Sequence, residues 1–266
     1  MKVGIYASYF GKDEPKTFPD VESFIDLGHE LQLDVIDFRV DVGFGSLDRE
    51  YLRDLKIKCL KAGLPIGYLA SGGHFVGTDE ELREKVEQAK ADVEVAAYLG
   101  TPMIRLFCGA PGVGDAEREI RCFQDVCDFA AKAGIIVGLQ NHPSTGDNVL
   151  RILREVDREN FTFILDTGQW VGSPGLNRGV GDPDVDIYQY MEQTAAFASH
   201  VRAKIYKIDS GREEWLDYPR IVGILKSAGF NGVVSITFEG QDVNECDDRE
   251  TFRLAARHLR ETIAAA

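Results

Sequence analysis

Short apolar runs and longer amphipathic stretches alternate eight times along the chain. Apolar runs bounded by turn residues are typical of buried strands, and the stretches between them carry Leu, Val and Ala at helical spacings of three and four. The predicted strands are Val3–Ser8, Val35–Val40, Pro65–Ala70, Met103–Phe107, Ile135–Gln140, Phe161–Asp166, Val201–Tyr206 and Val233–Phe238. The clearest predicted helices are Glu80–Tyr98, Ala116–Ala133, Tyr218–Ala228 and Arg249–Ala264.

Glycine follows several predicted helices, as expected where a helix ends and the chain returns to a parallel strand. Eight such strand and helix units predict a single (β/α)8 TIM barrel domain over residues 1–266. A doubly wound open sheet is the competing fold, and it usually has a glycine-rich phosphate turn after its first strand. The sequence after the first predicted strand, Ala7-Ser8-Tyr9-Phe10-Gly11, lacks the GxGxxG pattern. The helix-ending glycines are Gly63, Gly100, Gly134 and Gly229.

The chain is acidic, with 30 Lys and Arg residues against 44 Asp and Glu residues and a formal charge of −14. That charge repels phosphate backbones and anionic lipid surfaces, so we expect no nucleic acid and no membrane as partner. Five cysteines without CxxC spacing favour reduced thiols over a disulfide framework or a zinc ribbon. No apolar run reaches membrane length, and we expect a cytoplasmic protein.

Strand alternation predicts which side chains enter the barrel, because the apolar parity should face the helices. On the seventh strand, Val201, Ala203 and Ile205 are apolar, which leaves His200, Arg202 and Lys204 inside. The same argument brings in Asp166 at the end of the sixth strand, where an N-capping role is the alternative. The other residues predicted to point inward are Asp37, Arg39, Arg105, Gly138, Gln140, His142, Ser235, Thr237 and Glu239.

These inward groups include three carboxylates and four cations, a local formal charge of +1 inside an acidic protein. Buried charge is costly unless it is paired or meets a counter-ion. Two interpretations are open: a structural network of ion pairs, or a pocket for a hydroxylated or anionic small molecule. Two loops at the carboxyl ends of strands, Ser71–Thr78 with His74 and Gly172–Asp186, could cover such a ligand. Phe75 and Trp170 are candidates for an aromatic wall of the pocket, with packing beneath a loop as the alternative.

Several segments together resemble the xylose isomerase-like TIM barrels, the group of sugar phosphate isomerases and epimerases. The segments are GIYASYF, LGTPMIRLFCG, VGLQNHP, LDTGQW, HVRAKIYKID and WLDYPRIVGILKSAGFNGVVSITFEG, and they span nearly the whole chain. The resemblance implies the barrel fold and a carbohydrate-related isomerase or epimerase activity. It also carries a weak expectation of a homo-oligomer, because relatives often form dimers or tetramers.

The resemblance further implies one divalent metal held by Glu, Asp, His and Glu on strands five to eight. Here these positions are Gln140, Asp166, Arg202 and Thr237, and Gln169 stands where a His often follows the Asp. A charged guanidinium repels a metal ion, so we expect no metal and no other cofactor at this place. A displaced Mn, Mg or Zn site formed by Gln140, Asn141, His142 and Glu239 is the alternative.

The loss of both glutamates leaves His142, Asp166, Lys204 and Glu239 as the catalytic acid and base candidates. The predicted substrate-binding residues are His74, Arg105, Gln140, Gln169, Arg202 and Thr237. The leading hypothesis is a metal-independent isomerase-like or epimerase-like enzyme, or a lyase, acting on a small sugar-like keto or polyhydroxy compound. The alternative is a non-catalytic sugar or metabolite binder, or a subunit that supports an active partner. Endonuclease activity on DNA, known on the same fold, needs metal ligands and a basic surface that this sequence lacks.

Overall fold

The structure of the protein is a computed structural model that describes residues 1–7, 18, 20–40 and 43–266. The strands are β1 (Lys2–Ala7), β2 (Val35–Arg39), β3 (Ile66–Ala70), β4 (Met103–Phe107), β5 (Ile136–Gln140), β6 (Phe161–Asp166), β7 (Ala198–Ile205) and β8 (Val233–Phe238). The helices are α1 (Val21–Glu30), α2 (Arg49–Ala62), α3 (Asp79–Leu99), α4 (Ala116–Ala131), α5 (Gly146–Val156), α6 (Ile187–Thr194), α7 (Tyr218–Ser227), α8 (Asp248–Ala265) and the short 3-10 helices η1 (Pro174–Asn177) and η2 (Ala195–Phe197).

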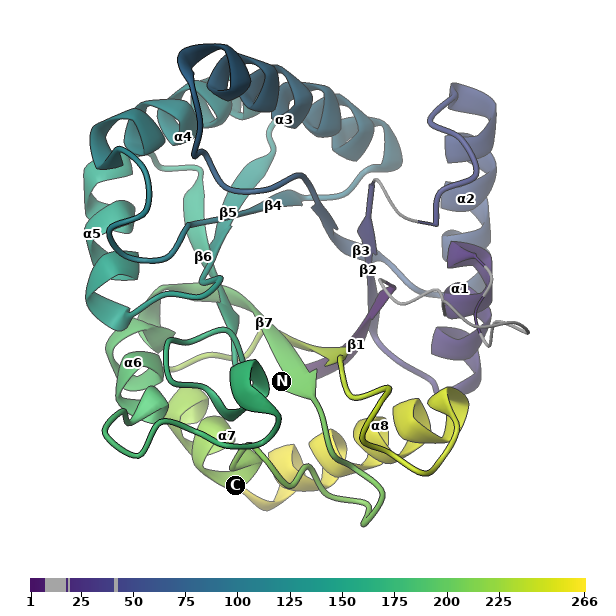
Figure 1. The fold of residues 1–266 in the computed structure, drawn as a ribbon. Helices are drawn as coiled ribbons and strands as arrows, with labels where there is room; N and C mark the ends of the chain where they lie inside the picture. The colour runs from purple at the N-terminus through teal and green to yellow at the C-terminus, as the bar shows by residue number, and fades with distance from the viewer. Residues whose placement is uncertain (8–17, 19, 41–42) are drawn as a thin grey trace.

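The eight strands form a closed parallel barrel in chain order, with β8 paired to β1. The helices surround this barrel on all sides (Figure 1). The architecture confirms the predicted (β/α)8 barrel. β7 begins earlier than predicted because Ala198 already pairs with Phe163 of β6, and the predicted end of the first strand at Ser8, with the Tyr9-Phe10-Gly11 segment after it, lies outside the described residues.

Local sequence signals explain where the helices begin and end. Thr78 caps α3 in a capping box with Glu81, and an aspartate side chain caps α1, α2, α4 and α8. Gly63 and Gly100 end α2 and α3 with φ of 71° and 79°, a left-handed conformation that costs glycine little. These ends return the chain to the amino-terminal end of the barrel, from which each next strand starts.

The barrel interior is layered along its axis. Near the amino-terminal end, His200 Nε2 lies 3.0 Å from the Asp37 carboxylate, and both side chains are buried. Above this pair, Tyr6 and Tyr68 stack with ring centroids 5.7 Å apart in a small interior apolar cluster. The larger apolar core lies between the strands and the helices. A further layer, at the carboxyl ends of the strands, is polar and charged.

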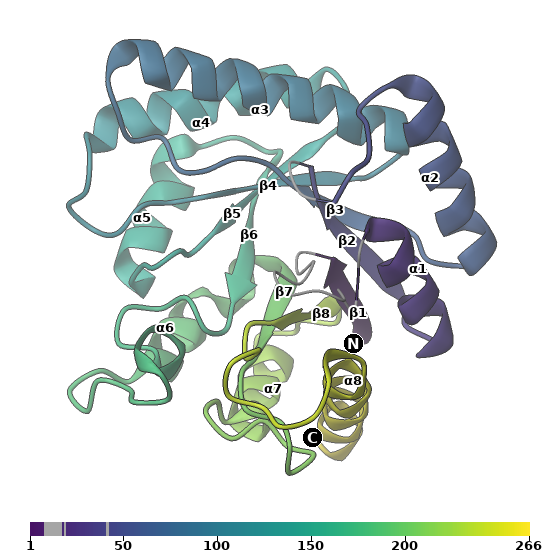
Figure 2. The ribbon, with the colours of Figure 1, turned by 45° about the vertical axis from the view of Figure 1, so that its right-hand side comes forward.

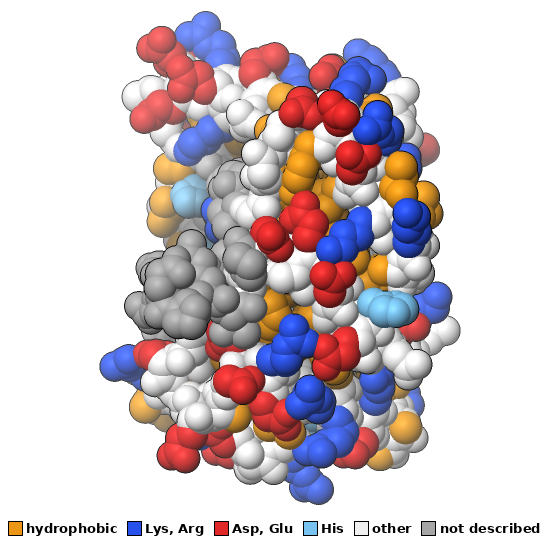
Figure 3. All heavy atoms as spheres, turned by 90° about the vertical axis from the view of Figure 1, so that its right-hand side faces the viewer, with side chains coloured by type: hydrophobic (Ala, Val, Ile, Leu, Met, Phe, Trp, Pro, Cys, Tyr) orange, Lys and Arg blue, Asp and Glu red, His pale blue; other side chains and the backbone are white. Residues whose placement is uncertain are grey.

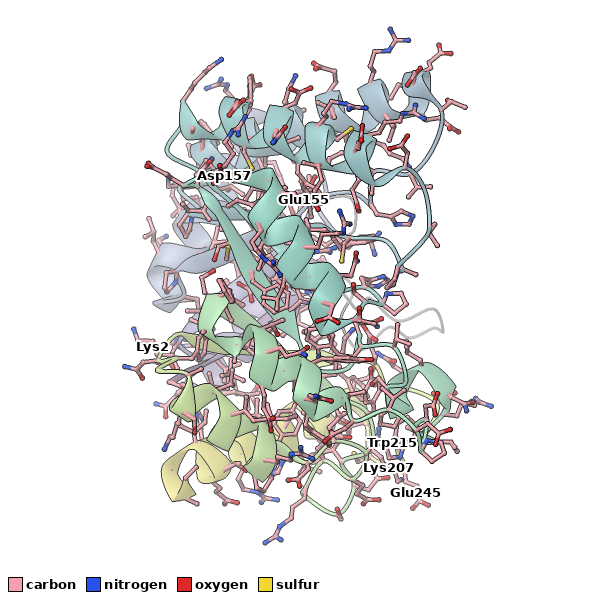
Figure 4. The ribbon with its side chains drawn as sticks, turned by 90° about the vertical axis from the view of Figure 1, so that its left-hand side faces the viewer. Lys2, Glu155, Asp157, Lys207, Trp215 and Glu245 are labelled. Carbon is pink, nitrogen blue, oxygen red and sulfur yellow. The ribbon has the colours of Figure 1, made fainter. Side chains whose placement is uncertain are left out.

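The two ends of the barrel are built differently. Lys2, at the start of β1, lies at one end of the molecule, while Lys207, Trp215 and Glu245, in the loops after β7 and β8, lie at the other (Figure 4). The 172–186 segment between β6 and α6 projects beside α6 at this carboxyl end (Figures 1 and 2). The carboxyl end therefore carries the longer loops, as in barrels that hold their sites there.

The outer surface is charged and mixed. Acidic and basic side chains are interspersed over the face formed by α1 and α2 (Figure 3). Within the described part of the chain, no helix combines the length and apolar character needed to cross a membrane.

One carboxyl group of the β7 to α7 loop is buried without a cation. Glu213 is 7% exposed, and its oxygens accept hydrogen bonds from the backbone N–H groups of Tyr206, at 2.7 Å, and Trp215, at 2.9 Å. Burial raises the pKa of Glu213 to about 7 from an ordinary value of 4.5, against the opposing effect of these hydrogen bonds. The folded protein therefore binds a proton here more tightly than the unfolded chain does.

This raised pKa predicts a pH-dependent stability. Between pH 4.5 and about 7 the folded state holds more protons at Glu213 than the unfolded state, so the free energy of unfolding should fall as pH rises through this window. The loss should reach roughly 3 kcal/mol. Urea titrations at several pH values should show this slope in the wild type and a smaller one in Glu213→Gln. The exposed Glu84 of α3 gives the control, since Glu84→Gln should keep the wild-type slope; equal slopes in all three proteins would contradict the assignment.

Candidate active site

A cavity of about 520 Å³ opens at the carboxyl end of the barrel. Every strand except β6 contributes to its wall, either directly or through the loop that follows it. The lining residues are Tyr6, Arg39, Ser71, Gly72, Gly73, Arg105, Phe107, Gln140, His142, Arg202, Lys204, Phe238, Glu239 and Gln241. The cavity lies where (β/α)8 enzymes place their sites.

Asp166, at the end of β6, anchors the charges beneath this cavity. Its side chain is fully buried. Oδ2 accepts hydrogen bonds from Gln140 Nε2 at 2.8 Å and from Arg202 Nε at 3.0 Å, and Oδ1 accepts one from the Gly168 N–H at 3.0 Å. Lys204 Nζ lies 3.6 Å from Oδ2. Asp166, Arg202 and Lys204 together are called the charged floor below.

Arg202 is held on several sides. Besides Asp166, its guanidinium donates to the Tyr68 hydroxyl and lies over the Tyr6 ring, 4.1 Å from the centroid. Both aromatic residues come from the interior cluster, so Arg202 connects the apolar middle of the barrel to the charged floor. A guanidinium fixed by a carboxylate, a hydroxyl and a ring face has little freedom to move.

Lys204 links the charged floor to the cavity. Its ammonium contacts Asp166 below and the Glu239 carboxylate above; the Lys204 side chain is 1% exposed, whereas that of Glu239 is 42% exposed. The strand here is secured by Thr167, whose hydroxyl accepts the Lys204 N–H at 2.9 Å, and by Tyr218, whose hydroxyl donates to the Lys204 carbonyl at 2.7 Å. Gly168 leaves room for the lysine stem, since a Cβ there would lie 2.7 Å from Lys204 Cγ.

Asn141 holds the ends of β5 and β6 together. Its amide donates to the carbonyls of Asp166, at 2.9 Å, and Gln169, at 3.0 Å, and its oxygen accepts the Asp166 N–H at 2.9 Å. The side chain is fully buried and all three contacts are to backbone. Asn141 therefore fixes the backbone that aims Asp166.

His142 lies in the cavity wall just beyond the end of β5, three strands around the barrel from β8. Its ring packs on Phe107 at 4.6 Å between centroids. Burial lowers the pKa of His142 below its usual value of 6.5, with Asp166 opposing the shift and Lys204 adding to it. The imidazole is therefore neutral at pH 7 and can accept a proton.

The structure brings together six of the predicted site residues in the cavity wall, and it places the other four elsewhere. Asp166 and Thr237 lie beneath the cavity, fully buried. His74 packs against Phe107 at 5.6 Å, and Gln169 is buried with its carbonyl bound to Asn141. The residues that line the cavity are Arg105, Gln140, His142, Arg202, Lys204 and Glu239.

The expectation that Phe75 and Trp170 form an aromatic wall of the pocket is wrong. Trp170 is fully buried and Phe75 is 2% exposed, and both belong to the core between strands and helices. The wall contains Tyr6 and Phe107 instead. Strand parity carried the missing signal: Tyr6 follows the inward Gly4 by two residues, and Phe107 follows Arg105 by two.

The residues beneath the cavity do not fit a divalent metal. The Asp166 oxygens already accept N–H donors, Arg202 presents a positive charge to the same carboxylate, and the Thr237 hydroxyl is within 3.5 Å of the Ser235 carbonyl. A displaced metal site also lacks free ligands. The Asn141 amide is hydrogen-bonded to backbone groups, and the Glu239 carboxylate pairs with Lys204. In the described ranges, no three His, Cys, Asp or Glu side chains are grouped to hold a metal ion.

Comparison with known proteins places this barrel in a family. The model of the xylose isomerase-like TIM barrel matches residues 25–262. The chain belongs to the xylose isomerase-like TIM barrel family. No curated protein matches it in sequence.

Solved structures of the same fold include several sugar epimerases. A D-psicose 3-epimerase from Clostridium cellulolyticum H10 superposes with a TM-score of 0.76 at 17% identity, covering 99% of each chain. The 3-keto-D-glucoside 4-epimerase YcjR from E. coli gives 0.72 at 17% identity, covering 98% of this chain and 99% of its own. The IOLI protein with a bound zinc atom gives 0.76 at 14% identity, covering 100% of this chain and 99% of its own. Identities this low show the shared fold of the family.

The Asp166–Arg202 pair predicts a large stability cost when one partner is removed. Arg202→Met leaves a buried carboxylate short of its main counter-charge and should lower the free energy of unfolding by about 3 kcal/mol. The double variant Asp166→Asn/Arg202→Met should cost less than the sum of the two single variants, as measured by urea unfolding.

A surface pair gives the matched control. Arg121 pairs with Glu117 at 3.5 Å, with their side chains 62% and 88% exposed, and Arg121→Met should cost less than about 1 kcal/mol. An equal decrease in the free energy of unfolding in the two arginine variants would show that the buried pair stabilises the fold no more than the surface pair does.

Proposed function

We propose that this protein catalyses metal-independent proton transfer next to the carbonyl of a small keto or polyhydroxy compound, as an isomerase or epimerase. The observation that carries the proposal is the charged floor: Arg202 and Lys204 both face Asp166 at the base of the cavity, at 3.0 and 3.6 Å. Two basic side chains are therefore fixed where a developing negative charge on oxygen would need stabilising.

The acid and base candidates stand directly above this floor. His142 and Glu239 each lie two residues beyond a position, Gln140 and Thr237, at which the family resemblance expects a glutamate. Two residues along a strand advance about 6.6 Å on the same face. Proton transfer in this chain would thus take place one step nearer the mouth, with Arg202 and Lys204 filling the space beneath.

The proposed chemistry uses each group in a defined role. A base removes the proton from the carbon next to the carbonyl, the C–H electron pair moves toward the carbonyl oxygen, and Lys204 with Arg202 stabilises the resulting enediolate. Return of a proton to the same carbon from the other side gives an epimer, and return to the former carbonyl carbon gives an isomer. Glu239, just beyond β8, and neutral His142, just beyond β5, face the cavity from the ends of separate strands, as a transfer between two faces requires.

The geometry favours a positioning role for Asp166, which was a candidate acid or base. Its carboxylate is fully buried and occupied by three N–H donors. The D-psicose 3-epimerase and the 3-keto-D-glucoside 4-epimerase of the same fold support the choice of reaction class, because their names specify a ketose and a keto sugar as substrates.

A deuterium-exchange experiment tests the proposal. Protein dialysed against EDTA is incubated in D2O with a panel of ketoses, sugar phosphates and inosose-like ketones, and NMR follows loss of C–H signals. We expect exchange by the wild type without added metal, and a reduction by a factor on the order of 10² or more in Glu239→Gln and His142→Asn, because each variant loses a group that carries the proton. The exposed variant Glu214→Gln should exchange at the wild-type rate.

Two results would overturn this function. Binding of a panel compound without exchange or product would identify a non-catalytic binder or supporting subunit. A stoichiometric divalent ion in the purified protein, lost in Asp166→Ala together with exchange, would show that the site works through a metal.

A further inference from the structure

Arg105 is a buried cation that has no carboxylate partner within the described part of the chain. It lies in the middle of β4, is 6% exposed and lines the cavity. Its only hydrogen bond to the described residues is a long one, 3.5 Å from Nη2 to the Tyr6 hydroxyl, and its Nε has no partner. Its guanidinium carbon lies 5.1 Å from the Phe107 centroid. Buried guanidinium groups are normally paired with an anion.

Arg202, in the same barrel, is a buried arginine whose guanidinium has hydrogen-bond and ring partners. It is 4% exposed, close to the value for Arg105, yet it holds a carboxylate, a tyrosine hydroxyl and a ring face. Burial lowers the pKa of Arg105 below its ordinary value, and the positive charge of Arg202 adds to this effect. An anion beside Arg105 would offset both the loss of hydration on burial and the repulsion from Arg202.

A second arginine lies at the same height. Arg39 of β2 and Arg105 of β4 are both in register with Ala70 of β3, so the two arginines flank a small side chain. Strands two apart in a sheet are separated by about 10 Å. The loop after β3 continues with Gly72 and Gly73, which also line the cavity and have no side chains to fill it. The three strands thus leave a space in the cavity wall, flanked by the two arginines.

The carboxylates at the cavity are engaged away from Arg105. Among the described residues, Asp166 contacts Arg202 and Lys204, and Glu239 contacts Lys204. Arg105 therefore lines the cavity without a carboxylate from these ranges beside it.

An acceptor for a hydrogen bond from a substrate hydroxyl lies between Arg105 and the charged floor. Gln140 is 1% exposed and lines the cavity, and while its amide nitrogen binds Asp166, its Oε1 has no hydrogen-bond partner. Since β5 pairs with β4, Phe107 stands in register with Gln140, one inward step above Arg105. A ligand reaching from Arg105 toward Lys204 would pass this acceptor.

We propose that the substrate carries an oxyanion group, a carboxylate or a phosphate, which binds at Arg105 beside Ala70. The inference rests on the proposed function, because it takes the same cavity as the substrate site. β3 and β7 stand on opposite sides of the eight-stranded barrel, so the anion at β3 orients the chain of the substrate across the mouth. Its carbonyl then meets Lys204 and Arg202, and a hydroxyl donates to Gln140 Oε1.

Calorimetric titration with matched probes tests this subsite. The probes are D-fructose, D-fructuronate and D-fructose 6-phosphate, which share one ketose configuration and differ at C6, together with acetate and inorganic phosphate alone. We expect at least one charged ketose to bind about tenfold or more tightly than D-fructose, because a buried guanidinium gains a charge-assisted hydrogen bond. Preference for D-fructuronate would identify a carboxylate site, and preference for D-fructose 6-phosphate a phosphate site.

Variants separate a specific site from general attraction. Arg105→Gln should weaken the preferred charged ketose by about 30-fold and leave D-fructose unaffected, since one charged hydrogen-bond partner is lost. Arg105→Lys, which keeps the charge but loses the planar fork, should fall between. Arg121→Gln, an exposed arginine on α4 with the same change in net charge, should bind like the wild type.

The outcomes also distinguish this inference from the proposed function. Equal binding of D-fructose and of both charged ketoses, or no binding of any charged probe, would overturn the oxyanion site. Arg121→Gln weakening the charged ketose as much as Arg105→Gln would also overturn it. Anion binding that depends on Arg105 while the bound compound undergoes no deuterium exchange would support the site and count against catalysis.

Discussion

The buried ion pair between Asp166 and Arg202 is the interaction on which the site depends. A carboxylate that is fully buried must be matched by donors and by positive charge, and here it receives three N–H groups and two cations. Arg202 extends from this carboxylate to Tyr68 and over the Tyr6 ring, so the pair also fixes the interior of the barrel. Gln140 and Lys204 contact the same carboxylate, and Lys204 links it to Glu239.

The pair changes what kind of electrophile the barrel offers. A zinc-bound protein shares this fold, whereas the residues beneath this cavity present a guanidinium and an ammonium to the same acid. Side-chain cations are held by covalent attachment and by their hydrogen bonds, so their charge is present in the free protein. Such fixed charges stabilise a developing oxyanion without reorganising during the reaction.

Charge is distributed unevenly between the outside and the inside. The surface carries the acidic excess, mixed with basic side chains on the face of α1 and α2 (Figure 3). Inside, Arg105 is buried and its Nε has no hydrogen-bond partner among the described residues. A low-dielectric interior makes the charge of Arg105 energetically important, because burial amplifies each uncompensated charge.

The sequence by itself determined the barrel and much of its interior. Periodicity set the eight units, and the parity of β7 correctly placed Arg202 and Lys204 inside, because alternation along a strand is a local property. Tertiary structure alone decided which inward residues meet. Asp166 and Thr237 point inward yet lie beneath the cavity. Trp170 is buried in the core between strands and helices. Tyr6, near the amino terminus, contacts Arg202 of β7. These outcomes depend on the stagger of strands around a closed barrel and on packing between distant segments, and no local pattern encodes that register.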